Sequence, residues 1–413
     1  MSPAHLINLD DIGNPAAERV SNLHALAREL NERARRAALV AATHAASVDA
    51  QPRFPAEAIA ALREQRLLGA MVPVRFGGEG ASISQVADIC YVLGRACASS
   101  AMIYAMHQVK IACLTRHVAG QPSMEAFARR IAREQLLVAS STTEGNNGGN
   151  VRSSDGAVVI DGDTMTLDRH ASVISYGASA DALMTTARRN ADAANTDQVL
   201  VLVHKDHYTL ASSGGWNTLG MRGTMSEGFR LHVAAPRDSV MSVPYAIIHA
   251  QSMVPTAHIL WSSVWAGIAA AALEKARLFV RTVARKSGGT LPPGASSMTR
   301  ATSKLQMLRA LIKDVAAKYE GFGDDVDAIG AMAFQSELLM LKVQASELAV
   351  EIVQDAMRAG GLAAYRQDGE FSIARHLRDV MAAPVMIHND RILGNAVSSS
   401  IMAEIAPSLL DVA

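Results

Sequence analysis

Hydroxyl groups and glycines that could hold a ligand are concentrated in residues 137–151, LVASSTTEGNNGGNV. The apolar run 137–139 predicts a strand, which ends in four consecutive hydroxyl residues at positions 140–143. The Asn and Gly residues that follow, Gly148 and Gly149 among them, predict a turn-rich loop whose free backbone N–H groups could bind an anion or a carbonyl oxygen. An ordinary loop at the end of a surface strand has the same composition, so this segment alone leaves both interpretations open.

Composition excludes several classes of function. The chain has 413 residues, of which 49% are apolar, and 39 Lys and Arg are balanced by 39 Asp and Glu. Zero net charge without a basic run provides no surface that attracts nucleic acid or an anionic membrane. An aromatic content of 4% also argues against base-stacking platforms. We therefore expect a large buried core.

The compartment is predicted from the cysteines and from two segments. Cys90, Cys97 and Cys113 lie in apolar helical sequence without metal-ligand spacing, which favours buried, reduced thiols, no metal site and a cytoplasmic protein. The first residues lack the pattern of a signal peptide. The apolar segment 259–273 is shorter than the about 20 residues of a membrane span, so a buried helix is expected.

Hydrophobic periodicity divides the chain into three parts, namely a helical domain at 1–136, a β domain at 137–240 and a helical bundle at 241–413. The predicted fold class is α+β, with an N-terminal all-α domain, a central antiparallel sheet or barrel and a C-terminal four-helix bundle. Helices are predicted at 17–47, 56–65, 82–96, 97–116, 123–134, 255–285, 297–320, 327–358 and 373–404. Strands are predicted at 157–161, 164–167, 171–175, 182–187, 198–203, 208–211 and 229–233.

Five segments in a fixed order resemble motifs of the acyl-CoA dehydrogenase superfamily of flavoenzymes. They are FPAEAIAALREQRLLGAMVPVRFGGEGAS with RACASSAMIYAMH in the first domain, TTEGNNGGN at 142–150, SVISYGASADALMTTA at 172–187, LGMRGT at 219–224, and AGG at 359–361 with RHLRD at 375–379. The resemblance extends from about residue 54 to residue 401. It implies a flavin, FAD or alternatively FMN or free reduced flavin, held between the β domain and the bundle.

The resemblance also implies which residues contact the flavin. Thr142, Thr143 and the neighbouring Gly148 and Gly149 would bind the pyrimidine edge of the isoalloxazine, and Ser175 would present a hydroxyl near its reactive centre. Val173 stands where the family has a Trp wall. At the dinucleotide end, Gly360 and Gly361 would admit a pyrophosphate, and Arg285 would reach the cofactor of a neighbouring subunit. Each residue also has an ordinary use, as a turn residue, a helix C-cap or a charge at a helix end.

The chain departs from the family at the catalytic base. The usual Glu falls at Ile387, and the alternative position in the long helix falls near Ala257. The nearest replacements are His388 and Asp390, which equally suit a loop His and a helix N-cap. The RRQFG motif is also missing, with ARKSGGT in its place, which leaves binding of the adenine end open.

Three functions remain open on this basis. The first is α,β-dehydrogenation of an acyl thioester, with His388 as base and an electron-transfer flavoprotein or oxygen as acceptor. The second is a two-component monooxygenase of the same fold, which takes reduced flavin from a reductase. The third is a non-catalytic flavin-fold subunit. The resemblance further implies a homo-oligomer, a tetramer in this family.

Overall fold

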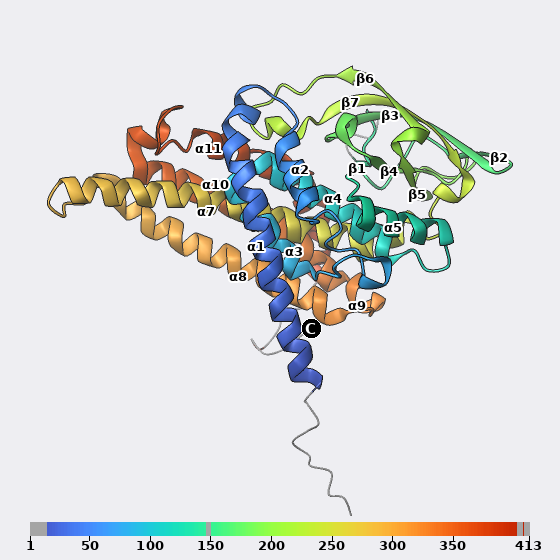
Figure 1. Cartoon of the computed structure of the whole chain (residues 1–413), viewed down its shortest axis with the longest axis horizontal. Coiled ribbons are helices and arrows are strands. Elements are labelled where there is room, and N and C mark those ends of the chain that lie inside the picture. Colours follow the sequence, from blue (N-terminus) through green and yellow to red (C-terminus); the bar gives the residue numbers. More distant parts are fainter. Residues whose placement is uncertain (1–14, 146–149, 403–407, 409–413) are drawn as a thin grey trace, which may run out of the picture.

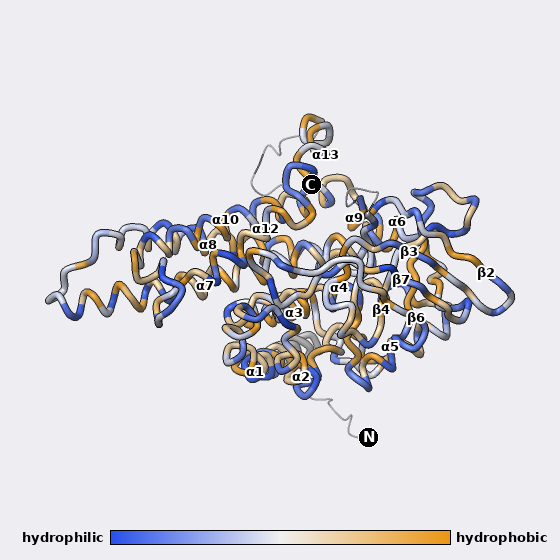
Figure 2. The backbone as a smooth tube through the Cα atoms, turned by 90° about the horizontal axis from the view of Figure 1, so that it is seen from above, coloured by the Kyte–Doolittle hydropathy of each residue, from blue (hydrophilic) through white to orange (hydrophobic). Residues whose placement is uncertain are grey.

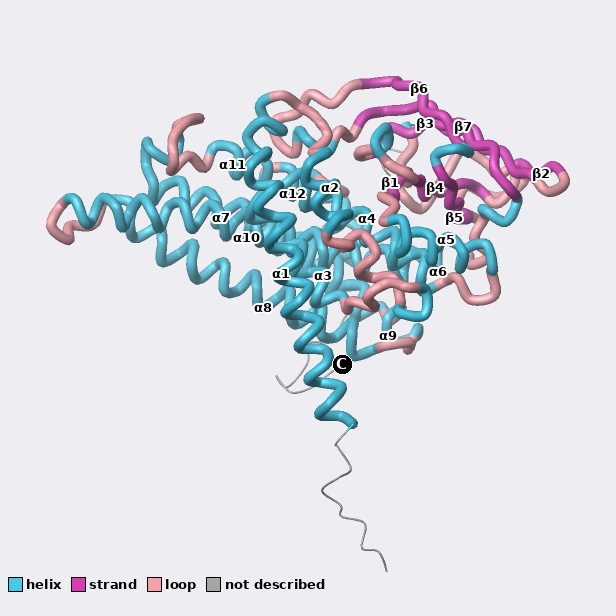
Figure 3. The backbone as a smooth tube through the Cα atoms, viewed as in Figure 1, coloured by secondary structure: helices cyan, strands magenta, loops and turns pink. Residues whose placement is uncertain are grey.

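The computed structural model describes residues 15–145, 150–402 and 408, and it shows a helical part, two small sheets and a second helical part in that order (Figures 1 and 3). The predicted α+β class is confirmed. The first part contains α1 (Pro15–Ala50), α2 (Ala56–Glu64), η2 (Val74–Phe76), α3 (Ile83–Ala96), α4 (Ala98–Arg116) and α5 (Pro122–Glu134).

Local sequence explains how these helices begin. The side chain of Ser82 accepts a hydrogen bond from the Gln85 backbone N–H, and the Gln85 side chain accepts one from the Ser82 N–H, which together form a capping box at the start of α3. Nearly every residue of α4 is buried, because apolar side chains surround the whole helix. Helix α4 therefore lies inside the molecule, between the sheets and the long helices.

The central part consists of two open sheets rather than a closed barrel. The strands are β1 (Val138–Ser141), β2 (Val159–Asp161), β3 (Thr164–Ile174), β4 (Ala182–Arg188), β5 (Gln198–His204), β6 (Tyr208–Gly214) and β7 (Glu227–Pro236). One sheet has the order β1-β4-β5 and the other β2-β3-β7-β6. The expectation of purely antiparallel pairing is wrong for β1, which runs parallel to β4.

The sequence predicts two separate strands at 164–167 and 171–175, and the structure has the single strand β3 there. The pairing of this strand with β7 shifts register between Ala171 and Ile174. This irregularity leaves Ser172 and Val173 both exposed, although neighbours in a regular strand face opposite sides. The bulge therefore turns two successive side chains outward beside the loop that follows β1.

The second helical part is built on three long helices. Its elements are α6 (Tyr245–Ile248), the π-helical turn η8 (His249–Met253), α7 (Val254–Lys286), η9 (Pro293–Ala295), α8 (Ser296–Phe322), α9 (Val326–Gly330), α10 (Met332–Tyr365), α11 (Ala374–Val380), α12 (Ala382–Val385) and α13 (Asn389–Met402). The predicted helix 373–404 is wrong as a single helix. Ile387 and His388 have left-handed φ angles of 51° and 59°, which interrupt it between α12 and α13.

Helix α7 is the centre of the core. It packs against α3 and α4 on one side and against α8 and α10 on the other, and the indole of Trp265 is fully buried. The segment Tyr245–Lys286 is long and apolar enough to cross a membrane, but 83% of its most apolar window is buried within the fold, as in a core helix of a soluble protein. The hairpin of α7 and α8 extends away from the body on the side opposite the sheets (Figures 1 and 2).

Candidate flavin site

Strand β1, which leads into the hydroxyl-rich loop, is held at its first residue from two sides. The Val138 N–H donates to Nδ1 of His107 at 3.0 Å, and the Val138 carbonyl accepts from the Tyr176 hydroxyl at 3.0 Å. Nε2 of His107 then carries the proton and donates to the Leu68 carbonyl at 2.8 Å. Burial lowers the pKa of His107 to about 4. This neutral imidazole joins α4, β1 and the chain after α2, and so fixes where the loop begins.

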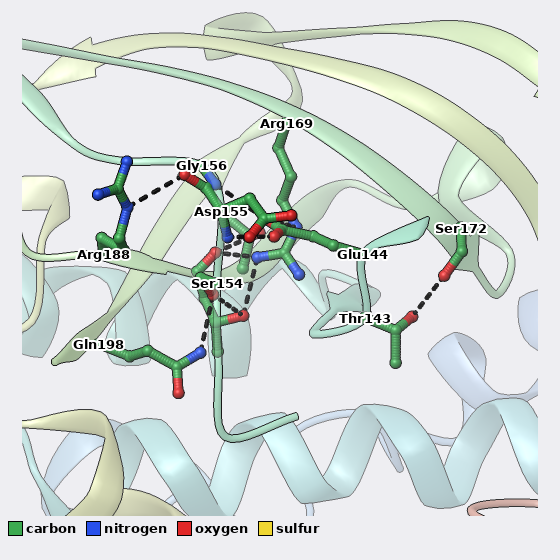
Figure 4. Close-up of polar contacts among 11 residues, drawn as sticks. Thr143, Glu144, Ser154, Asp155, Gly156, Arg169, Ser172, Arg188 and Gln198 are labelled. Atoms are coloured by element: carbon green, nitrogen blue, oxygen red, sulfur yellow. Dashed lines mark hydrogen bonds and ion pairs between the residues drawn. The ribbon is translucent and has the colours of Figure 1, made fainter. Parts of the chain in front are cut away.

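Glu144 holds the loop from beneath (Figure 4). Its carboxylate is buried and lies 3.2 Å from Nε of the equally buried Arg169 on β3. The same carboxylate accepts hydrogen bonds from the backbone N–H groups of Asp155 and Gly156, the second at 3.3 Å. Arg169 in turn donates to Oγ1 of Thr186 at 2.8 Å. Burial lowers the pKa of Arg169 to about 10. The Glu of the TTE motif is therefore a structural anchor.

Thr143, beside this anchor, faces the bulge of β3. The Ser172 hydroxyl donates to Oγ1 of Thr143 at 3.2 Å (Figure 4), and both Thr142 and Thr143 are half-buried. Val173, the next residue of the bulge, is 38% exposed. The bulge and the loop therefore present hydroxyl groups and one exposed apolar side chain close together.

A second group of hydroxyls begins at Ser175. Its Oγ lies 2.8 Å from Oγ of Ser226, which lies 2.9 Å from Oγ1 of Thr224. Tyr176, with a left-handed φ of 45°, donates its N–H to the Thr224 carbonyl at 2.8 Å and so turns the chain at this point. Ser175 is half-buried, whereas its two partners are buried. Of these three hydrogen-bonded hydroxyl residues, Ser175 is therefore the one that a ligand can reach.

The LGMRGT and RHLRD motifs pack directly on each other. Oδ1 of buried Asp379 accepts from the Met221 N–H at 2.7 Å, and a β-carbon at Gly220 would lie 2.1 Å from the Arg378 carbonyl oxygen. Burial raises the pKa of Asp379 to about 6. Arg378 pairs with Asp49 of α1 at 2.8 Å. These contacts join α1, α11 and the 219–224 turn, which places Thr224 next to Ser175.

The two predicted catalytic residues lie in the break between α12 and α13. Nδ1 of His388 is 3.7 Å from Oδ2 of Asp390, and the side chains are 58% and 88% exposed. Asn389 between them is buried, and its amide oxygen accepts from Nζ of Lys342 at 2.5 Å while its amide nitrogen donates to Ser346 at 3.0 Å. The loop is thus anchored from α10 through Asn389, and His388 and Asp390 point into solvent.

The remaining predicted cofactor residues do not lie close to Thr143 and Ser175 within one polypeptide. Gly148 and Gly149 lie outside the described residues. Arg285 is exposed in the last turn of α7, on the side of the molecule opposite the sheets (Figure 1). Gly361 has a left-handed φ of 53° and kinks the end of α10, and a β-carbon at Gly360 would lie 2.5 Å from that of Ala364. The candidates therefore form two separate groups.

Several residues that shape the site were missed at the sequence level. One of them had a readable signal, because Arg169 falls in the inward phase of β3 together with Met165, Leu167 and Ala171. A charged residue in the buried phase of a strand requires a buried partner. The backbone partners of His107 and Asp379 could not be predicted in this way, because no pattern in the sequence indicates which distant backbone group a side chain will meet. Among the described residues, no group of three or more His, Cys, Asp or Glu could hold a metal ion.

Comparisons with known proteins bear on the family and the fold of this chain. The model of the acyl-CoA dehydrogenase N-terminal domain matches residues 25–133, and that of the C-terminal domain matches residues 250–401. The chain is 26% identical over 350 residues to "Probable acyl-CoA dehydrogenase fadE25" of Mycobacterium leprae, covering 82% of this chain and 85% of that protein.

Solved structures with the same fold come from two classes of enzyme. FMN-bound TdsC of Paenibacillus sp. A11-2, a dibenzothiophene monooxygenase, superposes with a TM-score of 0.80 at 19% identity, covering 93% of this chain and all of that one. Butyryl-CoA dehydrogenase of Megasphaera elsdenii superposes with a TM-score of 0.77 at 16% identity, covering 91% and 98%. At these identities the superpositions establish the fold alone.

Proposed function

This chain belongs to the acyl-CoA dehydrogenase family, and on that premise we propose that it is a flavin-dependent oxidoreductase that oxidises a CH–CH bond of an acyl thioester. The observation that carries the proposal is the presence of two hydroxyl clusters, around Thr143 and Ser175, at the β3 bulge and at the end of β3 beside the 219–224 turn. Relatives that match over more than four-fifths of the chain are named for acyl-CoA substrates.

The residues present fit a flavin. Thr143 and Ser172 offer hydroxyls suited to the polar edge of an isoalloxazine, and Val173 offers an apolar contact where the family has a larger ring. Ser175 can donate to a ligand because its present partner, Ser226, has a second partner in Thr224. When bound, the flavin would accept the hydride that the substrate loses. The distinction between FAD and FMN depends on the second group of residues, Arg285 with Gly360 and Gly361.

The proton of the substrate requires a base, and we propose His388 for this role. In the described part of the chain, Ile387 occupies the position of the family's Glu, and the side chains of His388 and Asp390 are 58% and 88% exposed. A bound substrate would therefore have to cover the His388 ring. A neutral imidazole can accept a proton near pH 7, and the left-handed backbone at Ile387 and His388 holds the ring on a fixed turn.

Replacement of His388 tests this role. We expect His388→Gln to lower kcat about 100-fold or more and to abolish the acidic limb of the pH–rate profile, because the amide cannot accept the proton. His207→Gln, at an exposed His next to β6, is the matched control and should leave both unchanged. A His388→Gln enzyme with an unaltered pH–rate profile would assign the proton transfer to another group.

The reaction itself is tested by anaerobic titration of the flavin-loaded protein with a panel of acyl-CoA thioesters, while the flavin absorbance is recorded. Bleaching by one class of thioester would support dehydrogenation and identify the chain length. If no thioester bleaches the flavin, the dehydrogenase proposal is wrong. Without reduction of the flavin by a thioester, an electron-transfer flavoprotein would have no reduced flavin to reoxidise.

A second candidate function is a monooxygenase that uses reduced flavin from a partner reductase. It is favoured by the lack of a buried carboxylate in the 387–390 segment, because oxygenation does not require an α-proton to be removed. Oxygen consumption coupled to oxidation of an aromatic substrate, with reduced FMN supplied, would support this alternative. Oxygen consumption that yields only hydrogen peroxide would not.

We further propose that the second group of residues completes the cofactor site of a neighbouring subunit in a homotetramer. Arg285 and the glycines of α10 lie far from Thr143 in one chain (Figure 1). A second copy of the chain would bring them to the same flavin. A dinucleotide that spans both groups would then be held only in the assembled oligomer.

A further inference from the structure

Lys110, in the middle of α4, is a buried amine without an acidic partner. Lys110 is 3% exposed, and its Nζ donates a hydrogen bond to the sulfur of Met253 at 3.9 Å. Among the described residues, no carboxylate forms an ion pair with Lys110. Burial lowers its pKa. Because a buried ammonium normally requires a paired acid, the position is costly unless a ligand supplies the negative charge.

Lys110 lies in a largely apolar cluster into which Tyr245 and His249 bring polar groups. Tyr245, His249 and Met253 follow one another at spacings of four along α6 and the π-turn η8. The Tyr245 hydroxyl lies 3.2 Å from the Met253 sulfur, and its ring lies edge-on to that of His249, with centroids 5.5 Å apart. Burial, with Arg152 and Lys110 as further causes, lowers the pKa of His249 to about 3. Two polar side chains, Lys110 and Tyr245, thus converge on one thioether, and His249 lies against the ring of Tyr245.

The π-turn that presents His249 and Met253 is stabilised from several helices. Carbonyl groups that the wider turn leaves unpaired accept hydrogen bonds from other elements, Ala250 from Gln335 of α10 at 3.0 Å and Gln251 from Tyr319 of α8 at 2.9 Å. Ser252 bonds to Nε2 of His117 at 3.0 Å. π-Turns occur frequently at functional sites. These hydrogen bonds from α8, α10 and the end of α4 hold the π-turn in its irregular conformation, and so fix the positions of His249 and Met253.

Helix α4 and strand β1 connect this cluster to the candidate flavin site. His107, which holds β1, precedes Lys110 by one turn of α4. Strand β1 ends at Ser141, directly before Thr142 and Thr143. A substrate held against the flavin would reach Lys110 along α4, which packs against both β1 and η8. The flexible side chain of Met253 is the group that a ligand atom would displace from the amine.

We propose that Lys110, with Tyr245 and His249, forms a subsite for a carboxylate at the far end of the acyl chain, so that this enzyme takes dicarboxylic acyl thioesters. The inference rests on the proposed function for the position of the thioester, and Lys110 is the specificity-determining residue. The amine supplies the charge, and the phenol and imidazole supply further hydrogen bonds to the carboxylate. One small anion suits a single amine in an enclosed position, whereas a phosphate-rich group requires several exposed cations.

The test compares glutaryl-CoA with pentanoyl-CoA, which have equal chain lengths and differ in the terminal carboxylate. Binding to the flavin-loaded full-length protein is measured by calorimetry, and oxidation is measured separately as kcat and KM. We expect the wild type to bind glutaryl-CoA about tenfold or more tightly than pentanoyl-CoA, because a charge-assisted hydrogen bond is at stake. Lys110→Met should remove this preference, mainly through KM, and Tyr245→Phe should reduce it severalfold.

Lys275→Met is the control, because the Lys275 amine is half-buried on α7 and donates to the Glu370 carbonyl at 3.1 Å, away from this cluster. It should keep the preference. Lys110→Met should also raise Tm, because it removes a buried charge. A lowered Tm with unchanged selectivity would make Lys110 a purely structural residue and overturn the proposal.

The outcomes separate the subsite from the reaction. Equal use of both thioesters, unaffected by Lys110→Met, would overturn the subsite and leave the dehydrogenase function intact. Binding of glutaryl-CoA that depends on Lys110, without oxidation of either thioester, would support the subsite and refute the dehydrogenase function. If neither thioester binds, the subsite proposal is wrong.

Discussion

At the scale of single residues, the candidate site depends on two hydroxyls that are held in place by buried charges. Thr143 is the neighbour of Glu144, whose carboxylate is neutralised by Arg169 and by two backbone N–H groups. Ser175 is placed by the left-handed turn at Tyr176. Among the described residues, each hydroxyl bonds to another side-chain hydroxyl and not to the backbone. Its removal therefore leaves the backbone hydrogen bonds in place. Substitution at these positions therefore probes ligand binding more than folding.

Removing both hydroxyls is the direct test of the flavin assignment. We expect the double variant Thr143→Ala, Ser175→Ala to bind flavin about tenfold to 100-fold more weakly and to shift its absorption maximum, since two hydrogen bonds of about 1 kcal/mol each are lost. Flavin affinity is measured by fluorescence titration. Ser212→Ala, at an exposed serine on β6 of the same sheet, should change neither quantity. Full stoichiometry with an unshifted spectrum in the double variant would place the flavin elsewhere.

At the scale of elements, the contact between the 219–224 turn and α11 decides whether the site forms. Gly220 lies against the backbone of Arg378 so closely that a β-carbon would overlap the carbonyl oxygen. Gly220→Ala should therefore lower the free energy of unfolding by about 2–4 kcal/mol. Gly214→Ala, where a β-carbon would meet no atom within 4 Å, is the matched control. Equal denaturation midpoints for the two variants would show that the turn can move away from α11 at little cost.

The same contact predicts how stability changes with pH. Burial raises the pKa of Asp379 to about 6, whereas an unfolded carboxyl titrates near 3.9. The folded protein therefore binds more protons between about pH 4 and pH 6, and the contribution of this group to the free energy of unfolding falls as the pH rises through that window.

Asp379→Asn isolates this contribution, because the amide oxygen can still accept from Met221 but does not titrate. We expect the Tm of the wild type relative to that of Asp379→Asn to fall between pH 4 and pH 6, by the equivalent of about 2–3 kcal/mol. Above pH 6 the difference should be constant. Thermal melts at several pH values provide the measurement, and parallel curves across the window would contradict the assignment.

At the scale of the whole molecule, the α7–α8 hairpin extends away from the body (Figure 2), and exposed apolar side chains lie on it and at the end of α10. Leu291 and Met307 are 62% and 59% exposed, and Leu362 and Tyr365 at the end of α10 are 75% and 70% exposed. Exposed apolar side chains gathered at one end of a protein mark an interaction surface. The same end carries Arg285, so assembly and cofactor binding are expected to be coupled.

Charges introduced into this surface test the coupling. Leu291→Glu with Met307→Glu should shift the sedimentation coefficient from that of a homo-oligomer to that of a monomer and should reduce bound flavin. Val74→Glu, at a similarly exposed residue of η2 (73%), should remain assembled. A wild-type protein that sediments as a monomer with full flavin content would refute both the oligomer and the shared site.

The amino-acid sequence by itself determined the order of the elements and the motifs that meet at the 219–224 turn. Helical spacing, strand alternation and turn residues are local properties, so the three-part architecture and nearly every long helix could be predicted. The family motifs were readable for the same reason, because each lies within a few consecutive residues. The helix predicted at 373–404 failed where Ile387 and His388 adopt left-handed backbone angles, which residue type alone does not indicate.

The tertiary structure decided which of these residues share a site. Thr143 and Ser172 became neighbours only through the bulge of β3, and Glu144 found its partner 25 positions away in Arg169. Arg285 was separated from Thr143 because α7 extends away from the sheets, and Lys110 was buried with no acidic partner among the described residues because α4 lies inside the molecule. Such pairings depend on the packing of elements distant in the chain, and the free energy of burying a charge is set by that packing rather than by residue type.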